Sequence, residues 1–419
     1  MEELRDLEVY VFTTMPASCR IGLNLKSSCS RAGMSLVTLL LFPFALRGFI
    51  CCRLTSGGRF LGLNKFTKVR SRKSQTMDHW WILPVVVTVS FFLTVSLRQY
   101  AVARSLLDIP NFRSSHTVPT PRGGGVAIVV AFLLALVLLV LVGMISLPVF
   151  FASAGSGVLT AAIGFMDDHK HIAARWRLLG HFVAAGWALF WLGGIPPVSF
   201  LGASFDVGWA GYGFGVIYLV WMLNLYNFMD GIDGIAGVEA ICVCLGACTL
   251  YWVIGLNSLI PIPLLLALSV GGFLYWNFPP ARIFMGDAGS GFLGIILGVL
   301  SLQAVWASPQ LIWAWLILLG VFIVDATFTL LRRMLRGEKI YEAHRSHAYQ
   351  FASRAFGKHL PVTAGVALIN VFWLLPVALC VTKYGLDGGI GLVLAYAPLV
   401  WLAVKFKAGA REVDSSKAE

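Results

Sequence analysis

Residues 289–306 read GSGFLGIILGVLSLQAVW, eighteen residues in a row without a charged side chain. A run of this length approaches the roughly 20 apolar residues that an α-helix needs to cross a bilayer. The whole chain has the same character, since 58% of its 419 residues are hydrophobic and only 12% are charged. An ordinary soluble domain carries about 25% charged residues. The composition therefore excludes a soluble enzyme, a disordered chain and a coiled coil, and predicts a polytopic membrane protein.

Further apolar runs of similar length follow one another from residue 77 onward, and Pro, Gly or charged residues mark most of the gaps. The eleven runs are 80–97, 123–147, 149–166, 178–195, 212–226, 234–254, 259–277, 289–306, 310–331, 361–382 and 388–404. We therefore expect an all-α fold, a membrane bundle of about 11 transmembrane helices.

The basic residues in the connections predict the orientation of this bundle. The connections on one side hold 19 Lys and Arg residues, whereas the other side holds only Lys383. The basic side consists of residues 98–122, 167–177, 278–288, 332–360 and the tail after 404. Positive charge gathers on the cytoplasmic side of membrane proteins, so this side is predicted to face the cytoplasm.

Residues 1–76 differ from the rest of the chain. They hold 12 Lys and Arg against four acidic residues, which is most of the net charge of +12. We expect 1–76 to be a basic extension without a stable fold, or a segment upstream of a true start at Met77. Residues 77–410 then form the membrane domain and 411–419 a cytoplasmic tail. Because the excess charge belongs to this extension, it does not indicate a nucleic-acid partner.

Acidic residues lie at two helix boundaries on the predicted cytoplasmic side. The segment GFMDDHK (164–170) ends a run with adjacent Asp167 and Asp168, and FMGDAGS (284–290) places Asp287 just before a run. Carboxylates at a membrane boundary are costly to desolvate unless they are paired or bind a metal. Taken singly, Asp287 fits a helix N-cap and the adjacent pair fits solvated helix-end charges. Their convergence on one face favours a functional site.

A third acidic segment, NLYNFMDGIDGIAG (224–237), places Asn227, Asp230 and Asp233 three residues apart, near one face of a helical stretch. Hard oxygen ligands of this kind suit Mg²⁺, with Mn²⁺ as the alternative. The glycines of PTPRGGG (119–125) would let the backbone approach a phosphate closely. Together these segments predict a metal-dependent phosphoryl-transfer site.

Basic side chains near these acids have two interpretations each. Lys170, Arg175 and Arg177 are either membrane anchors or phosphate ligands. His344 and His347 fit an ordinary surface loop or a diphosphate-binding pair equally well.

Asp325 is the single acidic residue that we place inside a span, where it would pair with a basic group or support the site. A transporter or lipid flippase would have more intramembrane charges and an internal repeat. We find no repeat, which disfavours that class.

The motifs, in their order, resemble those of the polyprenyl-phosphate N-acetylhexosamine-1-phosphate transferases, which form glycosyltransferase family 4. The resemblance rests on the Asp167–Asp168 pair, the run from Asn227 to Ala236 and the run from Phe284 to Ser290. It extends from Met77 to about Lys407. This superfamily includes the phospho-MurNAc-pentapeptide translocase and the enzymes that start O-antigen and enterobacterial common antigen synthesis.

The resemblance implies transfer of N-acetylhexosamine 1-phosphate from a UDP-sugar to undecaprenyl phosphate, with release of UMP. It implies Mg²⁺ at Asp287 and Asn227, with Asn227 and Asp230 near the diphosphate. Asp233 would lie near the nucleoside and Phe284 would stack on uracil. An undecaprenyl acceptor further implies a multi-pass protein of the bacterial inner membrane, with the lipid bilayer as a partner and a homodimer as an open question.

The candidate site residues fall into two sets. The catalytic candidates are Asp167, Asp168, Asp230 and Asp233, and either Asp167 or Asp168 would deprotonate or orient the lipid phosphate. The substrate-binding candidates are Asn227, Phe284, Thr120, Arg122, Lys170, Arg175, Arg177, His344, Arg345 and His347.

One departure from the family pattern informs the substrate. The peptidoglycan translocase has a three-histidine run where this chain reads AHRSH at 343–347. This favours the branch that uses simple N-acetylhexosamines for O-antigen or related surface polysaccharide, and the connection 332–360 is the expected carrier of sugar specificity. The translocase and, from another class, a lipid-linked sugar flippase remain the alternatives.

Overall fold

The computed structural model describes residues 79–110, 118–170, 172–200, 203–205, 208–338 and 345–411. The expected extension 1–76 lies outside the described residues, as do His344 and all but the first residue of the expected tail 411–419.

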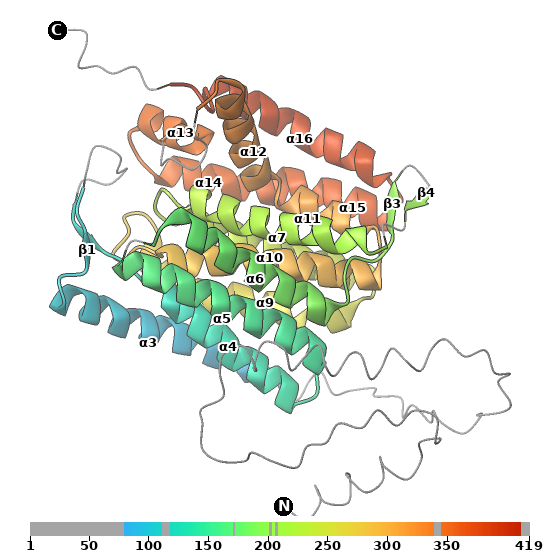
Figure 1. Ribbon diagram of the computed structural model, residues 1–419, viewed down its shortest axis with the longest axis horizontal. Coiled ribbons are helices and arrows are strands. Elements are labelled where there is room, and N and C mark those ends of the chain that lie inside the picture. The colour runs from blue at the N-terminus through green and yellow to red at the C-terminus, as the bar shows by residue number, and fades with distance from the viewer. Residues whose placement is uncertain are drawn as a thin grey trace, which may run out of the picture. The chain divides into compact units, whose positions relative to one another are not determined.

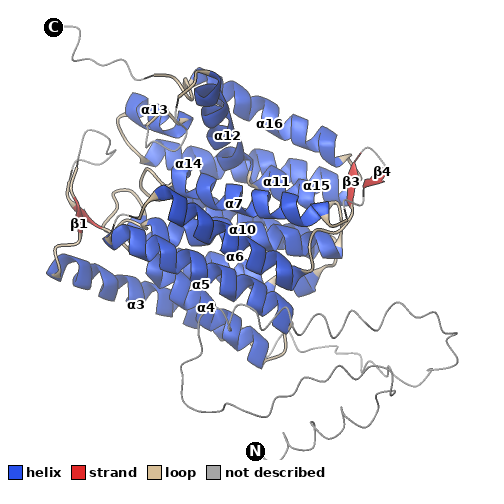
Figure 2. Ribbon diagram, in the orientation of Figure 1, coloured by secondary structure: helices blue, strands red, loops and turns tan. Residues whose placement is uncertain are grey.

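Helices dominate the described residues, because a chain in lipid must satisfy its backbone hydrogen bonds internally. Most of the long helices lie side by side with roughly parallel axes, whereas α12 is steeply inclined to them, and the strands are short (Figure 1, Figure 2). The α-helices are α3 (Ile82–Ala103), α4 (Gly125–Leu141), α5 (Leu147–His169), α6 (Ala174–Leu192), α7 (Ala210–Met229), α8 (Ile235–Val253), α9 (Pro261–Asn277), α10 (Asp287–Ala307), α11 (Leu311–Leu318), α12 (Gly320–Leu335), α13 (Ala348–Phe356), α14 (Leu360–Ile369), α15 (Leu375–Lys383) and α16 (Gly388–Lys405). The prediction of an all-α membrane bundle is confirmed.

Helix length and composition bear on the number of membrane crossings. Among the described helices, seven are long and apolar enough to cross a membrane, or eight if one bent pair counts as a single span. That pair is α11 and α12, whose axes differ by 72°. Each of the eleven predicted runs overlaps at least one of the described α-helices. The count of 11 crossings stays a prediction.

Two antiparallel hairpins lie at opposite ends of the bundle (Figure 2). One joins β1 (Leu107–Asp108) to β2 (Thr120–Pro121), and the other joins β3 (Val198–Phe200) to β4 (Ala203–Phe205). Strand β2 contacts the segment before α10, since Phe284 N donates to Pro121 O at 2.8 Å. The β1–β2 hairpin therefore lies at the end of the bundle where α10 begins.

Helices α4, α5 and α10 meet at Gly125, Gly164 and Gly289, which we call the glycine seam. A Cβ on Gly125 would lie 2.4 Å from Gly289 Cα, and a Cβ on Gly164 would lie 2.5 Å from the backbone of Asp287. Real Cβ atoms do not approach backbone so closely, so only glycine allows these helices to touch. The seam fixes the ends of α5 and α10 against each other.

The structure places a second acidic residue inside a span, and the expectation of a single one is wrong. Glu239 lies in α8 and is fully buried. Its Oε2 accepts a hydrogen bond of 2.6 Å from Nδ2 of Asn370, which begins a π-helical turn (Asn370–Leu374) between α14 and α15. In the sequence, Glu239 is a single acidic residue inside the otherwise apolar run 234–254, and the expectation overlooked it.

Candidate functional site

The end of α5 and the start of α10 are joined by one carboxylate. Asp168 on α5 accepts hydrogen bonds from Asp287 N at 3.1 Å and from Ala288 N at 3.3 Å. Gly286, with φ +77°, precedes the helix and leaves room for the Asp168 oxygens. The N-cap interpretation of Asp287 is therefore wrong. Asp287 is the first residue of α10, and Asp168 satisfies the free backbone amides of this helix end.

Two arginines connect three carboxylates into what we call the carboxylate cluster, namely Asp167, Asp168 and Asp287. Arg122 lies 2.7 Å from Asp287 Oδ1 and 2.9 Å from Asp168 Oδ1. Arg177 lies 2.5 Å from Asp167 Oδ2 and 3.8 Å from Asp287 Oδ2. The side chains of Asp167 and Asp168 are each only 5% exposed. They are thus not solvated helix-end charges, and that alternative is wrong.

Asp230 directly follows the last residue of α7. Burial raises the pKa of the Asp230 carboxyl to about 7, and the negative charges of Asp287 and Asp168 also raise it. Helices α7 and α10 pack antiparallel, and a Cβ on Gly294 would lie 2.7 Å from Leu223 Cα. Asp230 and Asp287 each lie about two turns beyond this contact toward the same end of the bundle, which brings Asp230 to the level of the carboxylate cluster. Asn227 lies one turn earlier on α7. The sequence thus correctly predicted that all three acidic segments converge.

The raised pKa of Asp230 predicts a pH-dependent stability difference. A raised folded-state pKa stabilises the fold below the unfolded pKa of about 4, and this contribution is lost as the pH rises through about 7. The neutral Asp230→Asn variant should match the wild type in melting temperature near pH 4.5 and exceed it near pH 8. The measurement is thermal unfolding of detergent-solubilised protein in a metal chelator. A difference in melting temperature that does not change with pH would contradict the burial of an ionised Asp230 in the folded protein.

The donor set at the cluster suits a hard divalent cation. Mg²⁺ is typically held by one or two carboxylates and completes its octahedron with water and substrate phosphate oxygens. Asp168 and Asp287 already share one cationic group, the guanidinium of Arg122, within 3 Å. Within the described ranges, no three His, Cys, Asp or Glu side chains form a ready metal cage. The carboxylates of the cluster are thus of the ligand type that a hard divalent cation prefers.

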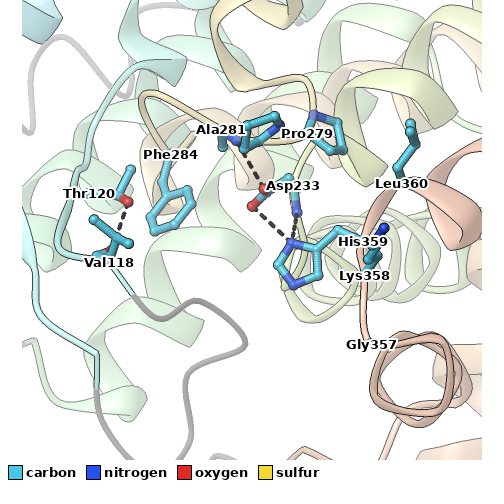
Figure 3. Close-up of a pocket in the computed structure, with 11 residues that line it drawn as sticks. Val118, Thr120, Asp233, Pro279, Ala281, Phe284, Gly357, Lys358, His359 and Leu360 are labelled. Carbon is cyan, nitrogen blue, oxygen red and sulfur yellow. Dashed lines mark hydrogen bonds and ion pairs between the residues drawn. The ribbon is translucent and has the colours of Figure 1, made fainter.

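A pocket of about 470 Å³ opens around Asp233. Asp233 Oδ2 accepts a hydrogen bond from Ala281 N at 2.9 Å, and its Oδ1 lies 3.1 Å from His359 Nδ1. Figure 3 shows Phe284 and Thr120 on one side of the pocket and Asp233 with His359 on the other. The pocket thus combines an aromatic ring with a paired carboxylate.

The sequence missed two residues of this pocket, Lys358 and His359, which precede α14. Their residue types offered a signal, because Lys358 is one of the basic residues of the connection 332–360. The sequence analysis used this basic residue only to predict which side of the bundle faces the cytoplasm. The sequence does not reveal that the connection folds back onto Asp233.

The remaining predicted site residues lie in different surroundings. Lys170 and Arg175 are exposed, and Arg175 lies 5.8 Å from the ring centroid of Trp176. His347 is 1% exposed and its Nδ1 lies 3.3 Å from Asp325 Oδ1, so the surface-loop interpretation of His347 is wrong. Arg345 accepts a hydrogen bond at its carbonyl oxygen from Arg354 at 3.2 Å.

Comparison with known proteins matches this sequence to a family model and to several relatives. A family model described as glycosyl transferase family 4 matches residues 150–305, which include the carboxylate cluster, Asp230 and Asp233. A probable undecaprenyl-phosphate N-acetylglucosaminyl 1-phosphate transferase of Bacillus subtilis (strain 168) is 31% identical over 294 residues, covering 65% of this chain and 78% of that protein.

Two further relatives have similar coverage. An undecaprenyl-phosphate α-N-acetylglucosaminyl 1-phosphate transferase of Thermotoga maritima is 30% identical and covers 64% of this chain and 80% of that protein. A phospho-N-acetylmuramoyl-pentapeptide-transferase of Moorella thermoacetica is 29% identical and covers 54% of this chain and 74% of that protein.

Proposed function

The chain belongs to glycosyl transferase family 4, and from this premise we propose that it transfers N-acetylhexosamine 1-phosphate from a UDP-sugar to undecaprenyl phosphate. The relatives from Bacillus and Thermotoga are named for undecaprenyl-phosphate N-acetylglucosaminyl 1-phosphate transfer, which supports the acceptor and the group transferred. The observation that carries the proposal is the carboxylate cluster with Arg122, together with the pocket around Asp233 that Phe284 also lines, which we call the Phe284 pocket.

We place this reaction at the start of O-antigen or related surface polysaccharide synthesis, at the cytoplasmic face of a bacterial inner membrane. The 19-to-1 distribution of basic residues supports the orientation. The absence of a three-histidine run at 343–347 supports the choice of a simple N-acetylhexosamine.

The reaction exchanges one phosphoanhydride bond for another. An oxygen of undecaprenyl phosphate attacks the sugar-linked phosphorus of the UDP-sugar, and the bond from that phosphorus to the bridging oxygen breaks. The electron pair of this bond leaves with UMP, and the lipid diphosphate sugar remains. Both reactants are anions, so the protein must offset their repulsion in the transition state.

The described residues divide this task. Arg122 and Arg177 supply positive charge beside the carboxylate cluster, where the reacting phosphates would lie. Asp287, with Asn227 of α7, would hold Mg²⁺, which when bound neutralises phosphate charge and polarises the attacked phosphorus, and Asp168 would support Asp287 through the backbone amides of α10. Because a lipid phosphate is already anionic near pH 7, orientation by Asp167 or Asp168 contributes more than removal of a proton.

The Phe284 pocket would hold the nucleoside, with uracil on the ring of Phe284. Replacing Phe284 with Ala removes a stacking surface worth about 1–3 kcal/mol per base. We expect the KM for the UDP-sugar to rise about tenfold while the KM for undecaprenyl phosphate stays within about twofold. Phe284→Tyr keeps the aromatic face and serves as the control. An equal rise in both KM values would place Phe284 outside the nucleoside pocket.

The proposal is tested with the purified full chain, undecaprenyl phosphate, Mg²⁺ and a panel of UDP-sugars, by measuring UMP release. UMP from a UDP-N-acetylhexosamine supports the proposal, and replacing Mg²⁺ with a chelator should abolish it. Absence of UMP release with every UDP-sugar would refute it. Release only with UDP-MurNAc-pentapeptide would assign the chain to peptidoglycan synthesis, the activity named for the relative from Moorella.

A further inference from the structure

Asp325 bridges two helices that are separated in sequence. It lies on α12 and is 7% exposed. Its Oδ1 accepts a hydrogen bond of 2.9 Å from Ala348 N, and its Oδ2 accepts one of 3.0 Å from Tyr349 N. These are the first two residues of α13, so the carboxylate of one helix satisfies the free amides of another. A carboxylate at a helix N-terminus is also favoured by the helix dipole.

Two further groups complete the surroundings of Asp325. Thr329 Oγ1 donates to Asp325 Oδ1 at 3.1 Å, and His347 Nδ1 lies 3.3 Å from the same oxygen. Thr329 lies on α12 with Asp325, so its bond stays within one helix, whereas the amides of Ala348 and Tyr349, with His347, connect Asp325 to the start of α13.

Helix α13 in turn contacts the backbone that carries Asp230. Tyr349 is 5% exposed, and its hydroxyl donates to Phe228 O at 3.0 Å. A Cβ on Gly231 would lie 2.1 Å from the Tyr349 hydroxyl oxygen, so this side chain is pressed against the chain on both sides of Asp230. The ring of His347 is stacked with the rings of both Phe228 and Tyr349, at centroid distances of 6.5 Å and 5.7 Å. The position of α13 therefore determines the position of residues 228–231.

We propose that Asp325 is a positioning residue for the transfer reaction, acting through Tyr349 to hold the backbone of Asp230 against the carboxylate cluster. The expected effect on kcat rests on the proposed function. The structural link from Asp325 to residues 228–231 rests on the contacts alone. Asp233 has its own partners in Ala281 and His359. A shift of the Asp230 backbone should therefore lower kcat and leave nucleotide binding nearly intact.

The kinetic experiment uses the full-length protein in detergent with undecaprenyl phosphate, Mg²⁺ and the UDP-sugar that the wild type turns over. Asp325→Asn keeps the size of the side chain but gives up the charge and one acceptor oxygen. Tyr349→Phe removes only the hydroxyl that reaches Phe228. We expect each to lower kcat about tenfold, with the KM for the UDP-sugar within about twofold. The matched control is Thr329→Val, which removes one hydrogen bond to Asp325 and spares the amides of α13, and we expect its kcat to stay within about twofold.

The double variant separates positioning from simple loss of stability. If Asp325 acts through Tyr349, the double variant loses no more kcat than the worse single variant, because both changes break one route. Losses that multiply, or a kcat of Asp325→Asn within twofold of the wild type, would overturn the proposal.

Hydrogen exchange provides a readout that needs no turnover. Amide exchange of residues 228–233 should be faster in Asp325→Asn and in Tyr349→Phe than in the wild type, and unchanged in Thr329→Val. Unchanged exchange in both test variants would refute the positioning role even if the wild type is active. Conversely, faster exchange in the two test variants, combined with a wild type that releases no UMP, would refute the proposed function and leave the structural link between Asp325 and residues 228–231 intact.

Discussion

Asp287→Asn should abolish turnover, with kcat reduced about a thousandfold or more. The substitution keeps the shape of the side chain and removes the negative charge that lies 2.7 Å from Arg122 and faces the proposed cation. A metal ion that stabilises transition-state charge contributes several kcal/mol, and each 1.36 kcal/mol is a factor of about ten in rate. Raising the Mg²⁺ concentration should recover part of the activity, because the variant lowers the affinity for the cation. UMP release at several Mg²⁺ concentrations measures both effects.

The control for Asp287→Asn is another aspartate at a helix start. Asp387 precedes α16 and accepts hydrogen bonds from Gly389 N at 2.9 Å and Ile390 N at 3.2 Å. Asn caps helices about as well as Asp, so Asp387→Asn should retain normal activity. An Asp287→Asn variant with more than a tenth of the wild-type kcat at ordinary Mg²⁺ would rule out its assigned role.

Asp168→Asn should lower kcat about a hundredfold, because this carboxylate acts at two places. It accepts hydrogen bonds from two amides at the start of α10 and also pairs with Arg122. An amide side chain offers a single acceptor oxygen and no charge, so it cannot serve both. Supporting groups around a metal site typically contribute 10–100-fold to activity or metal affinity. Steady-state UMP release, with the melting temperature of each variant recorded alongside, measures the effect.

Glu338→Gln is the matched control for this loss of charge. Glu338 also pairs with arginines, lying 3.0 Å from Arg333 and 3.1 Å from Arg336, and it is not part of the carboxylate cluster. We expect kcat within about twofold of the wild type for this variant. Equal losses in Asp168→Asn and Glu338→Gln would mean that general charge balance, rather than the cluster, governs the rate.

The sequence predicted the helices and the convergence of the acids well, since both depend on local information. Apolar runs mark helices directly, and the glycine-flanked acids mark helix ends. The hydrogen-bond partners of those acids could not be predicted from the sequence, because Asp168 accepts a hydrogen bond from an amide 120 residues away. Nothing local to Asp287 indicates that its helix is capped from α5.

The region around α13 shows most clearly which structural features the sequence could not predict. The connection 332–360 was expected to carry sugar specificity without any assigned structure, yet it contains α13, whose start is held by Asp325. A helix of nine residues is marginal by itself in water, and tertiary contacts stabilise it. Those contacts, like the pairing of His359 with Asp233, depend on how the chain folds back and not on residue spacing.

The glycine seam restricts how this protein can change its substrate. At Gly125, Gly164 and Gly289 the helices beneath the carboxylate cluster meet backbone to backbone, so no side chain there can be enlarged or trimmed. Substitutions that change the substrate are therefore expected in the pocket lined by Phe284 and Asp233, where Lys358 and His359 belong to a connecting segment. Libraries that vary this segment should yield altered donors, whereas libraries that vary the seam should yield proteins that do not accumulate.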